Sequence, residues 1–472
     1  MSKEHDFLGE IEVPDEAYYG IQTERARNNF AISGATCDDL PEFIRAIAEV
    51  KKAAALANNK IGALDDDICE AICAAADEVI TGKMAGNFPI DVFQGGGSTS
   101  TNMNVNEVIA KRANEILTGR KGYDKVHPNT HVNRGQSTND VIPTAIEITC
   151  HRHAFELKKS LEHLNAAFAC KAEEFKTIVK TSRTCLQDAV PITLGQEFSG
   201  YQSFTARHIK LLDELFFSKP LELTLGGTAT GTGLSTFEGY MEEVFVQLER
   251  VTGIKVKQRE NLFDGFQNGD DYIRMSAFMK SLATGLGKIA TDLRMMSSGP
   301  RCGLQEIFLP AVQPGSSIMP GKINPVMPEL VNQICYQVCG DDVAITMAVE
   351  GGELDLNVWE PVIIKNLTEQ FKLLTGGMIK FADLCIDGIK ANVDKLRADA
   401  EATMANATVA STILGYPKGT EIAQKAVTEG KTVKQVIREL KLFSDEEIDK
   451  LFDTLMMTDW RQSGKILATK KF

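Results

Sequence analysis

The sequence predicts an all-α protein organised around a long helix bundle. Apolar residues recur at steps of three and four, the spacing that places them on one face of a helix. The longest such stripe joins Leu367, Phe371, Leu374, Met378, Phe381 and Cys385. Strand-like alternation is scarce, and we expect only short strands, near the N-terminus and around Thr224. Long amphipathic helices with nearly heptad spacing pack against one another, which favours a bundle.

Four further stripes extend this prediction along the chain. They occupy residues 43–54, 157–168, 241–251 and 278–296, and Gly253 provides a stop signal for the third. We interpret each stripe as core packing. A helix of about 30 residues spans about 45 Å, more than one small domain covers. Because such helices often bury their stripes against other subunits, we expect a homo-oligomer.

Composition excludes several classes of function. The formal net charge of −13 over 472 residues disfavours nonspecific binding to nucleic acids or anionic membranes, which requires basic patches. The N-terminal residues lack an apolar signal core, and no apolar run approaches the roughly 18 residues of a membrane span. The cysteines show helix-face spacing, as in Cys69/Cys73 and Cys335/Cys339, and HExxH is absent. We therefore expect reduced thiols, no metal site and a cytoplasmic location.

Polar, glycine-rich segments separate the helical stripes, at residues 94–102, 135–140, 226–233 and 314–325. None matches the GxxxxGK[ST] phosphate-binding loop. We interpret Gly226–Gly233 as a tight connection between helices rather than a substrate contact. Thr101-Asn102 and Ser137-Thr138-Asn139 lie close to helix starts, where hydroxyl, amide and free N–H groups suit carboxylate binding. Helix capping is the alternative for each cluster, but two such clusters favour ligand binding.

The segment from Gly315 to Pro325 is the strongest local feature. It offers a hydroxyl pair at Ser316-Ser317, one cation at Lys322 and one amide at Asn324. A nucleophilic serine normally needs a neighbouring histidine or a GxSxG turn, and this segment has neither. This weakens the case for acyl-enzyme chemistry and leaves proton abstraction open.

This segment resembles the GSSxMPxKxNP signature of the aspartase/fumarase superfamily. Other parts of the chain resemble further blocks of that family: residues 98–107, 136–145 and 183–189, and Leu8-Gly9 with Tyr18-Tyr19-Gly20. The resemblance runs essentially from end to end.

The resemblance implies a particular architecture. Members are mostly α-helical, have three domains and form a homotetramer with a twenty-helix core, in which three subunits build each active site. The matching domains here are residues 1–139, 140–393 and 394–472; the last begins where the sequence becomes more charged. In this region Ser444-Asp445-Glu446-Glu447 predicts a capping box that opens a last helix. The family needs neither metal nor organic cofactor.

The resemblance also implies a reaction and its residues. A serine removes the proton next to a carboxylate, and the aci-carboxylate formed expels an amine or hydroxyl group to give fumarate. Ser316 matches the base. Residues that match substrate contacts are Thr101, Ser137, Thr138, Asn139, Thr184, Cys185, Ser317, Lys322 and Asn324. The closing loop of the family would exclude water around Ser316, with Gly315 and Gly321 as hinges.

One residue departs from the family pattern at a position that bears on the leaving group. Cys185 stands where many relatives have His and some have Gln; in fumarases that His works with a Glu matched by Glu329. The simplest interpretation is that Cys185 fills space. Glu329 after Pro328 and Glu360 before Pro361 resemble the ammonia-eliminating members of the family, and this resemblance implies elimination of ammonia from L-aspartate. The alternatives are hydration of fumarate, a lyase for a substituted aspartate or another C4 dicarboxylate, and a non-catalytic protein with this fold.

Overall fold

The computed structural model describes residues 1–468, which form two compact units. The first unit comprises Met1–Lys158, Leu211–Ser281 and Tyr336–Leu374, and the second comprises Lys159–Lys210, Leu282–Cys335 and the described residues from 375 onward. Five long helices supply residues to both units. They are α5 (Thr138–Glu174), α6 (Leu194–Phe216), α9 (Asp270–Met296), α10 (Val326–Glu350) and α11 (Glu360–Leu384).

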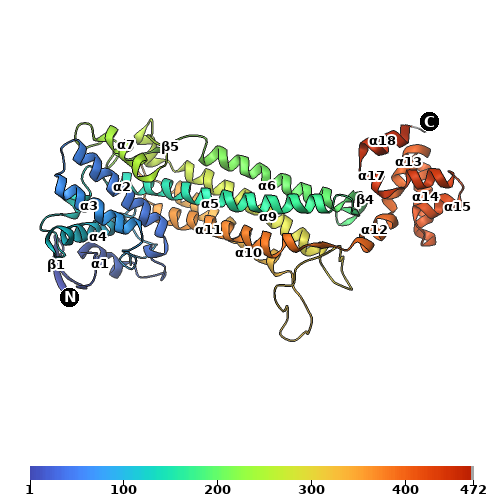
Figure 1. The fold of residues 1–472 in the computed structure, drawn as a ribbon, viewed down its shortest axis with the longest axis horizontal. Helices are drawn as coiled ribbons and strands as arrows, with labels where there is room; N and C mark the ends of the chain where they lie inside the picture. Colours follow the sequence, from blue (N-terminus) through green and yellow to red (C-terminus); the bar gives the residue numbers. More distant parts are fainter. Residues whose placement is uncertain (469–472) are drawn as a thin grey trace. The chain divides into compact units, whose positions relative to one another are not determined.

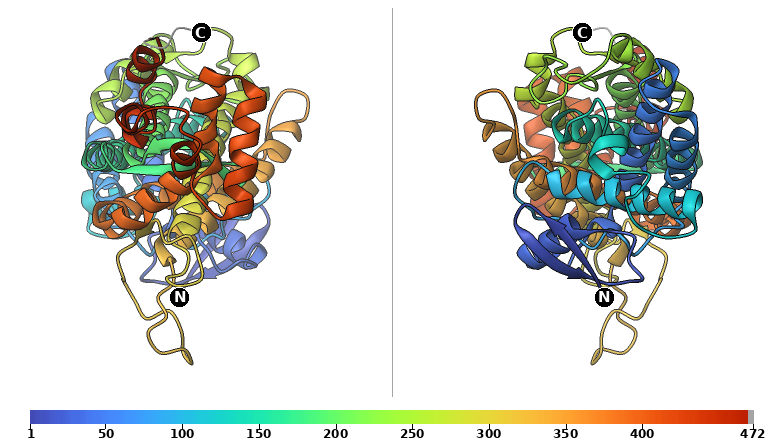
Figure 2. Two further views of the ribbon diagram at one scale, coloured as in Figure 1. Left: turned by 90° about the vertical axis from the view of Figure 1, so that its right-hand side faces the viewer. Right: turned by 90° about the vertical axis from the view of Figure 1, so that its left-hand side faces the viewer.

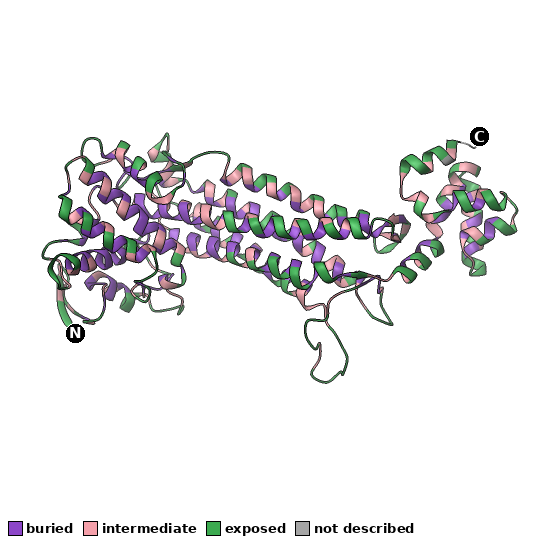
Figure 3. Ribbon diagram, in the orientation of Figure 1, coloured by how far each residue is buried: buried purple, intermediate pink, exposed green. Residues whose placement is uncertain are grey.

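The predicted stripes are the buried faces of these helices, and the all-α prediction is confirmed. Leu157, Leu161, Leu164 and Phe168 of α5 have no exposed surface. Figure 3 shows buried and exposed residues alternating along the long helices, as an amphipathic pattern requires. The 367–385 stripe is also buried, although its last member, Cys385, lies just beyond the end of α11.

Buried polar contacts fix the helices within each unit. In the first unit, Gln370 of α11 donates to Ser276 of α9 and to the Val338 carbonyl of α10, each at 3.0 Å. In the second, Tyr201 of α6 donates to Asp292 of α9 at 2.9 Å. Such bonds specify which helix faces meet, because breaking one leaves a buried polar group unpaired.

Shorter elements complete the first unit. The helices are α1 (Ile21–Asn29), α2 (Pro41–Lys60), α3 (Asp66–Ile80), α4 (Thr99–Thr118), α7 (Tyr240–Thr252) and α8 (Leu262–Gln267). Strands β1 (Ser2–Asp6) and β2 (Gly9–Val13) pair antiparallel, as Figure 2 shows, and β5 (Leu221–Leu223) pairs parallel with β6 (Val256–Gln258). The short strands expected at the N-terminus and beside Thr224 are therefore confirmed, as is the α7 stop at Gly253, whose φ is +71°.

The second unit adds two small sheets and a group of short helices. Strands β3 (Val179–Thr184) and β4 (Gln187–Thr193) form a hairpin, and β7 (Ile307–Phe308) pairs antiparallel with β8 (Lys390–Ala391). The helices are α12 (Val393–Ala402), α13 (Ala407–Leu414), α14 (Tyr416–Glu429), α15 (Val433–Glu439), α16 (Asp445–Leu451), α17 (Thr454–Met457) and α18 (Trp460–Ala468). Residues 407–452 enclose a hydrophobic cluster of their own.

One prediction about this region was partly wrong. Ser444 and Glu447 do form a capping box at the start of α16, but α16 is not the last helix. Asp453 caps α17 by accepting from the N–H groups of Leu455 and Met456, and α18 follows. Helices of four to nine residues are too short to show a stripe. The three-domain division at residues 139 and 393 stays a prediction.

No helix within residues 1–468 has the length and apolarity needed to cross a membrane.

Candidate active site

The first group of predicted site residues meets at two helix starts in the first unit. Thr101 lies in the first turn of α4, and Ser137 directly precedes Thr138, the first residue of α5. The Asn102 amide donates to the Thr138 hydroxyl at 3.2 Å and so joins the two Ser/Thr/Asn clusters. Thr101 and Thr138 are buried, whereas Ser137 and Asn139 are half-buried.

A fully buried lysine supports this group. Lys51 of α2 donates to the side-chain oxygens of Asn133 and Gln136, at 2.8 and 3.0 Å. The Asn133 oxygen also accepts from Asn102 at 3.3 Å, which connects the lysine to the contact between Asn102 and Thr138. Burial lowers the pKa of Lys51 to about 7. The network places a potential positive charge behind a cluster suited to an anionic ligand.

Asp140 is the counter-charge of this network. Its Oδ1 accepts from the Ser137 N–H at 2.8 Å, and its Oδ2 accepts from the N–H groups of Gly226 and Thr228, each at 3.0 Å. Burial raises the pKa of Asp140 to about 7, although these N–H groups and the Lys51 charge favour the carboxylate. The carboxyl group thus binds the start of α5 to the glycine-rich loop 226–233.

That loop differs from the predicted helix–helix connection. It follows strand β5 rather than a helix and leads towards α7. Its backbone N–H groups bind Asp140, and its Ala229 carbonyl accepts from the Asn139 side chain at 2.7 Å. Glycine is required at 226, where φ is +87° and a Cβ would lie 2.5 Å from Met241 Sδ. The loop was predicted only as a connection between helices, but it contacts Asp140 and Asn139 beside the predicted site residues.

Glu360 is a second buried carboxyl group near these segments. It begins α11, is 5% exposed, and its Oε2 has no hydrogen-bond partner among the described residues. A Cβ built on Gly97, in the glycine-rich segment 94–102, would lie 3.7 Å from that oxygen. Burial raises the pKa of Glu360 to about 7, although its own backbone N–H opposes the shift.

We predict that Glu360 makes stability fall as pH rises. Its folded pKa of about 7 lies above the unfolded value of 4.5, so folding favours the protonated form. The contribution is complete below the unfolded pKa and is lost as pH rises through 7, at most roughly 3 kcal/mol. Denaturant unfolding of Glu360→Gln at pH 5 and pH 8 should show a weaker pH dependence than the wild type. Glu353→Gln, at an exposed position, serves as the control, and equal slopes for wild type and Glu360→Gln would refute the prediction.

Ser316 lies in the irregular loop between β7 and α10 of the second unit, a loop that Figures 1 and 2 draw as a gold coil. The Gly315 N–H donates to the Lys322 carbonyl at 2.8 Å, and the Asn324 amide donates to the Gly315 carbonyl at 2.7 Å, which closes the neck of the loop. A Cβ at Gly315 would lie 2.6 Å from the Lys322 carbonyl oxygen, so only glycine fits there.

The Ser316 hydroxyl oxygen accepts two backbone hydrogen bonds. The N–H of Ile318 lies 3.2 Å away and that of Met319 lies 2.9 Å away. Hydrogen bonds to the charged form of a group stabilise that form, so these donors favour a serine alkoxide. Ser317 is exposed, and Gly321 has a φ of +81°, which suits a hinge.

Lys322 and Asn324 line a cavity of about 630 Å³ in the second unit. Its wall also contains the cations Arg183 and Arg294. Among the described residues that line it, none is acidic, although the whole chain carries a net charge of −13. Concentrated positive charge in a concave site suits a small anion. Thr184, Cys185, Ser316 and Ser317 are not among the lining residues.

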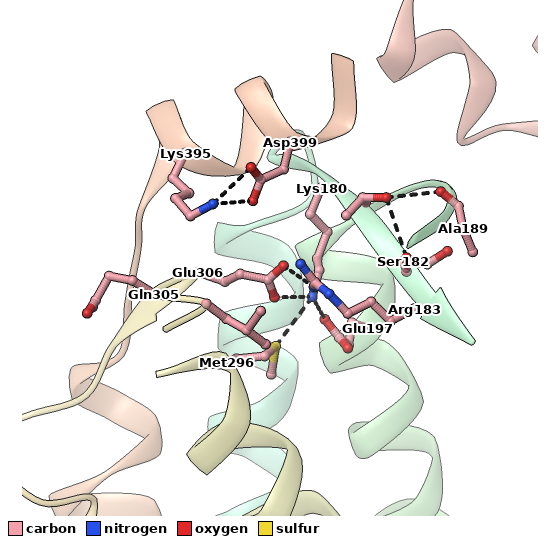
Figure 4. A network of polar contacts seen from close by, with 12 residues as sticks. Lys180, Ser182, Arg183, Ala189, Glu197, Met296, Gln305, Glu306, Lys395 and Asp399 are labelled. Carbon is pink, nitrogen blue, oxygen red and sulfur yellow. Dashed lines mark hydrogen bonds and ion pairs between the residues drawn. The ribbon is translucent and has the colours of Figure 1, made fainter. Parts of the chain in front are cut away.

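A buried ion-pair network anchors the hairpin beside this cavity (Figure 4). Lys180 of β3 lies 2.6 Å from Glu197 of α6 and 2.8 Å from Glu306, which also pairs with Arg183. Glu306 has no exposed surface. Because breaking a buried pair leaves an uncompensated charge, this network holds β3 and its following turn in place.

Thr184 and Cys185 lie at the tip of that hairpin, and both are exposed. Thr184 pairs with Gln187, so the loop has two residues, Cys185 and Leu186, with φ of +53° and +61°. Positive φ at both positions is the signature of a type I′ turn, which favours Asn-Gly. The interpretation that Cys185 fills space stays a prediction.

We predict that Leu186→Gly stabilises the protein. Leu186 is 70% exposed and therefore loses little packing, whereas a left-handed backbone costs a leucine roughly 1 kcal/mol that glycine avoids. Denaturant unfolding should give a gain of about that size. Leu234→Gly, at an exposed leucine without positive φ, should instead lose stability. A net loss in Leu186→Gly would show that strain in this turn is not what limits stability.

The structure thus divides the predicted site residues into two groups, one in each unit. Thr101, Ser137, Thr138 and Asn139 belong to the first unit, and the other predicted residues belong to the second. Sequence reasoning missed Lys51, Asp140 and Arg294. Lys51 carried a visible signal, because it falls four residues after Ile47 on the apolar face of its helix.

Comparison with known proteins first gives the class. Residues 9–340 match the family model described as lyase, and residues 407–459 match the model of the fumarase C C-terminus. The chain belongs to this lyase family, within the aspartase/fumarase superfamily, which confirms the resemblance found in its sequence motifs.

Several individual proteins are similar to this chain over nearly its whole length. The aspartate ammonia-lyase of Bacillus subtilis is 44% identical over 99% of this chain and 98% of its own length. A crystal structure of a fumarate lyase/delta crystallin from Brucella melitensis bound to cobalt is 45% identical, with a TM-score of 0.93 over 97% of this chain and 99% of that one. The class II fumarase of Schistosoma mansoni is 35% identical, with a TM-score of 0.92 over 97% and 99%.

Proposed function

We propose that this chain is an aspartate ammonia-lyase, which converts L-aspartate reversibly to fumarate and ammonia. The near-complete alignment with a Bacillus subtilis protein of that name carries the proposal. The loop chemistry supports it, because the Ser316 oxygen accepts two backbone N–H groups within the family signature. Purified protein offered L-aspartate should release fumarate and ammonia in equal amounts, and absence of both products would overturn the proposal.

In the proposed reaction, Ser316 acts as an alkoxide base. Its oxygen takes a proton from C3 of aspartate, and the C–H electrons pass into the adjacent carboxylate to give an aci-carboxylate. Those electrons then return to form the C2=C3 double bond as the C2–N bond breaks, and ammonia leaves with its electron pair. The Ile318 and Met319 N–H groups stabilise the alkoxide, and closure of the loop would exclude water.

The remaining residues bind the substrate and stabilise developing charge. We assign Lys322 and Asn324 to a substrate carboxylate, since both line the basic cavity. Thr101, Ser137 and Thr138 form the pocket for the aci-carboxylate, with the buried Lys51 behind them. Residues proposed for further contacts are Asn139, Thr184, Cys185 and Ser317.

We also propose a cytoplasmic homotetramer with a twenty-helix core, three domains per chain and three subunits contributing to each active site. An exposed apolar face supports self-association: Tyr336, Val343 and Met347 of α10 are 70%, 61% and 64% exposed and recur at helical spacing. Shared sites can be tested by mixing two inactive variants, Ser137→Ala and Ser316→Ala. Hybrid assemblies should regain part of the activity if the two residues come from different subunits, and none if one subunit supplies both.

A further inference from the structure

The cavity that contains Lys322 also contains a cation that the motif comparison did not assign. Arg294 stands in the last turn of α9 and lines this cavity together with Lys322, Asn324 and Arg183. They come from strand β3, helix α9 and the loop before α10, all within the second unit. A cation in this cavity is available to a ligand only if no carboxylate of the protein already neutralises it.

Arg183 is already neutralised. Its guanidinium pairs with Glu306, a carboxylate with no exposed surface that also binds Lys180 at 2.8 Å. Its position is thus set by the buried network of Figure 4 rather than by the cavity. A ligand would have to compete with a buried ion pair for this side chain, which is costly.

Arg294 is positioned but not neutralised. Its Nη1 donates to Asn332 Oδ1 at 3.1 Å, and it makes no ion pair with a carboxylate among residues 1–468. Asn332 is fixed in turn, because its amide donates to the Gly287 carbonyl at 2.9 Å and to Thr291 at 3.2 Å. A single neutral contact therefore orients the guanidinium and leaves its other N–H donors available.

Lys322 has no ion-pair partner in the described part of the chain either. Two uncompensated cations in a cavity without acidic walls favour a ligand with two negative charges. A guanidinium fork matches a carboxylate with two parallel hydrogen bonds, which an ammonium cannot do. We propose that Arg294 binds one carboxylate of the C4 dicarboxylate and Lys322 binds the other. The choice of a C4 dicarboxylate rests on the proposed function.

A purely structural role for Arg294 is the competing explanation, since its bond to Asn332 links α9 to α10. The two roles predict different results. A structural residue affects stability and all ligands alike. A binding residue affects ligands according to their carboxylates, and a lysine should partly replace it, because lysine keeps the charge and loses the fork.

Binding of unreactive ligands to the full-length protein separates these roles. Calorimetric titration with succinate, a C4 dicarboxylate, and with butyrate, a C4 monocarboxylate, should be run on Arg294→Gln and Arg294→Lys. Lys322→Ala provides a comparison in the same cavity. Arg207→Gln is the matched control, because Arg207 is an exposed helical arginine whose Nη1 likewise makes one neutral contact, to the Ser203 carbonyl at 3.2 Å.

We expect Arg294→Gln to bind succinate about 10- to 100-fold more weakly, the effect of losing a charge-assisted hydrogen bond. Its succinate affinity should approach that for butyrate, Arg294→Lys should be intermediate, and Arg207→Gln should match the wild type. Unchanged succinate binding in Arg294→Gln, or an equal loss for both ligands, would overturn the proposal. So would a wild type that binds succinate no better than butyrate. Because neither ligand reacts, a failure to deaminate aspartate would refute the proposed function while leaving this test intact.

Discussion

Ser316→Ala is expected to abolish most turnover while leaving the fold intact. The side chain lies on an irregular loop, is half-buried, and makes only local hydrogen bonds to Ile318 and Met319. Removing a positioned base typically costs about 10²- to 10⁴-fold in rate. Steady-state kinetics should show this loss in kcat with little change in KM, because the hydroxyl acts on the proton in the transition state rather than on ground-state binding.

Ser317→Ala is the natural comparison, since it removes the same atom one residue away. Ser317 is exposed and is proposed only as a substrate contact, so we expect less than about a tenfold loss in kcat/KM. Thermal unfolding of both variants should match the wild type. A near-normal kcat in Ser316→Ala would remove Ser316 as the base, and equal losses in the two variants would indicate disruption of the loop.

Asp140→Asn should have the largest effect on stability. All three groups that contact the carboxylate are N–H donors, from Ser137, Gly226 and Thr228. An asparagine amide would point a donor at a donor and would leave the buried Lys51 without its counter-charge. Each buried N–H group left without an acceptor costs roughly 1–3 kcal/mol, a loss that denaturant unfolding can measure.

Activity should fall in the same variant, because Asp140 holds Ser137 and the glycine-rich loop together. Asp355→Asn changes an exposed aspartate and serves as the charge-matched control. Lys51→Met and the double variant complete a cycle that isolates the interaction between the two side chains. A loss below about 1 kcal/mol in Asp140→Asn, or simple additivity in the cycle, would show that the two side chains do not form a coupled pair.

Periodicity in the sequence was sufficient for the helices because burial of an apolar face is a local signal. The 157–168 and 278–296 stripes each lie in one long helix with the predicted face buried. Capping chemistry is equally local, and the Ser444 box and the Gly253 stop were both correct. Helices α17 and α18 were not predicted because, at four and nine residues, they are too short to show a repeat.

The residues that hold the site together could not be predicted from the sequence, because they contact positions far away along the chain. Asp140 is 86 residues from Gly226 along the chain, and Lys51 is 82 residues from Asn133. No spacing rule connects such pairs. In the sequence Arg294 is one basic residue in the last turn of a helix. Its position in the cavity wall, which only the structure shows, distinguishes it from other arginines. The sequence did not predict the turn at Cys185-Leu186, because neither residue is typical of a type I′ turn.

Whether ammonia or water is the leaving group can be measured directly. Fumarate formation should be followed by its ultraviolet absorbance with L-aspartate and L-malate offered in parallel, using the wild type and Ser316→Ala. The wild type is expected to turn over aspartate but not malate, and the variant neither. Turnover of malate alone would identify a fumarate hydratase that tolerates Cys185, and would contradict the assignment.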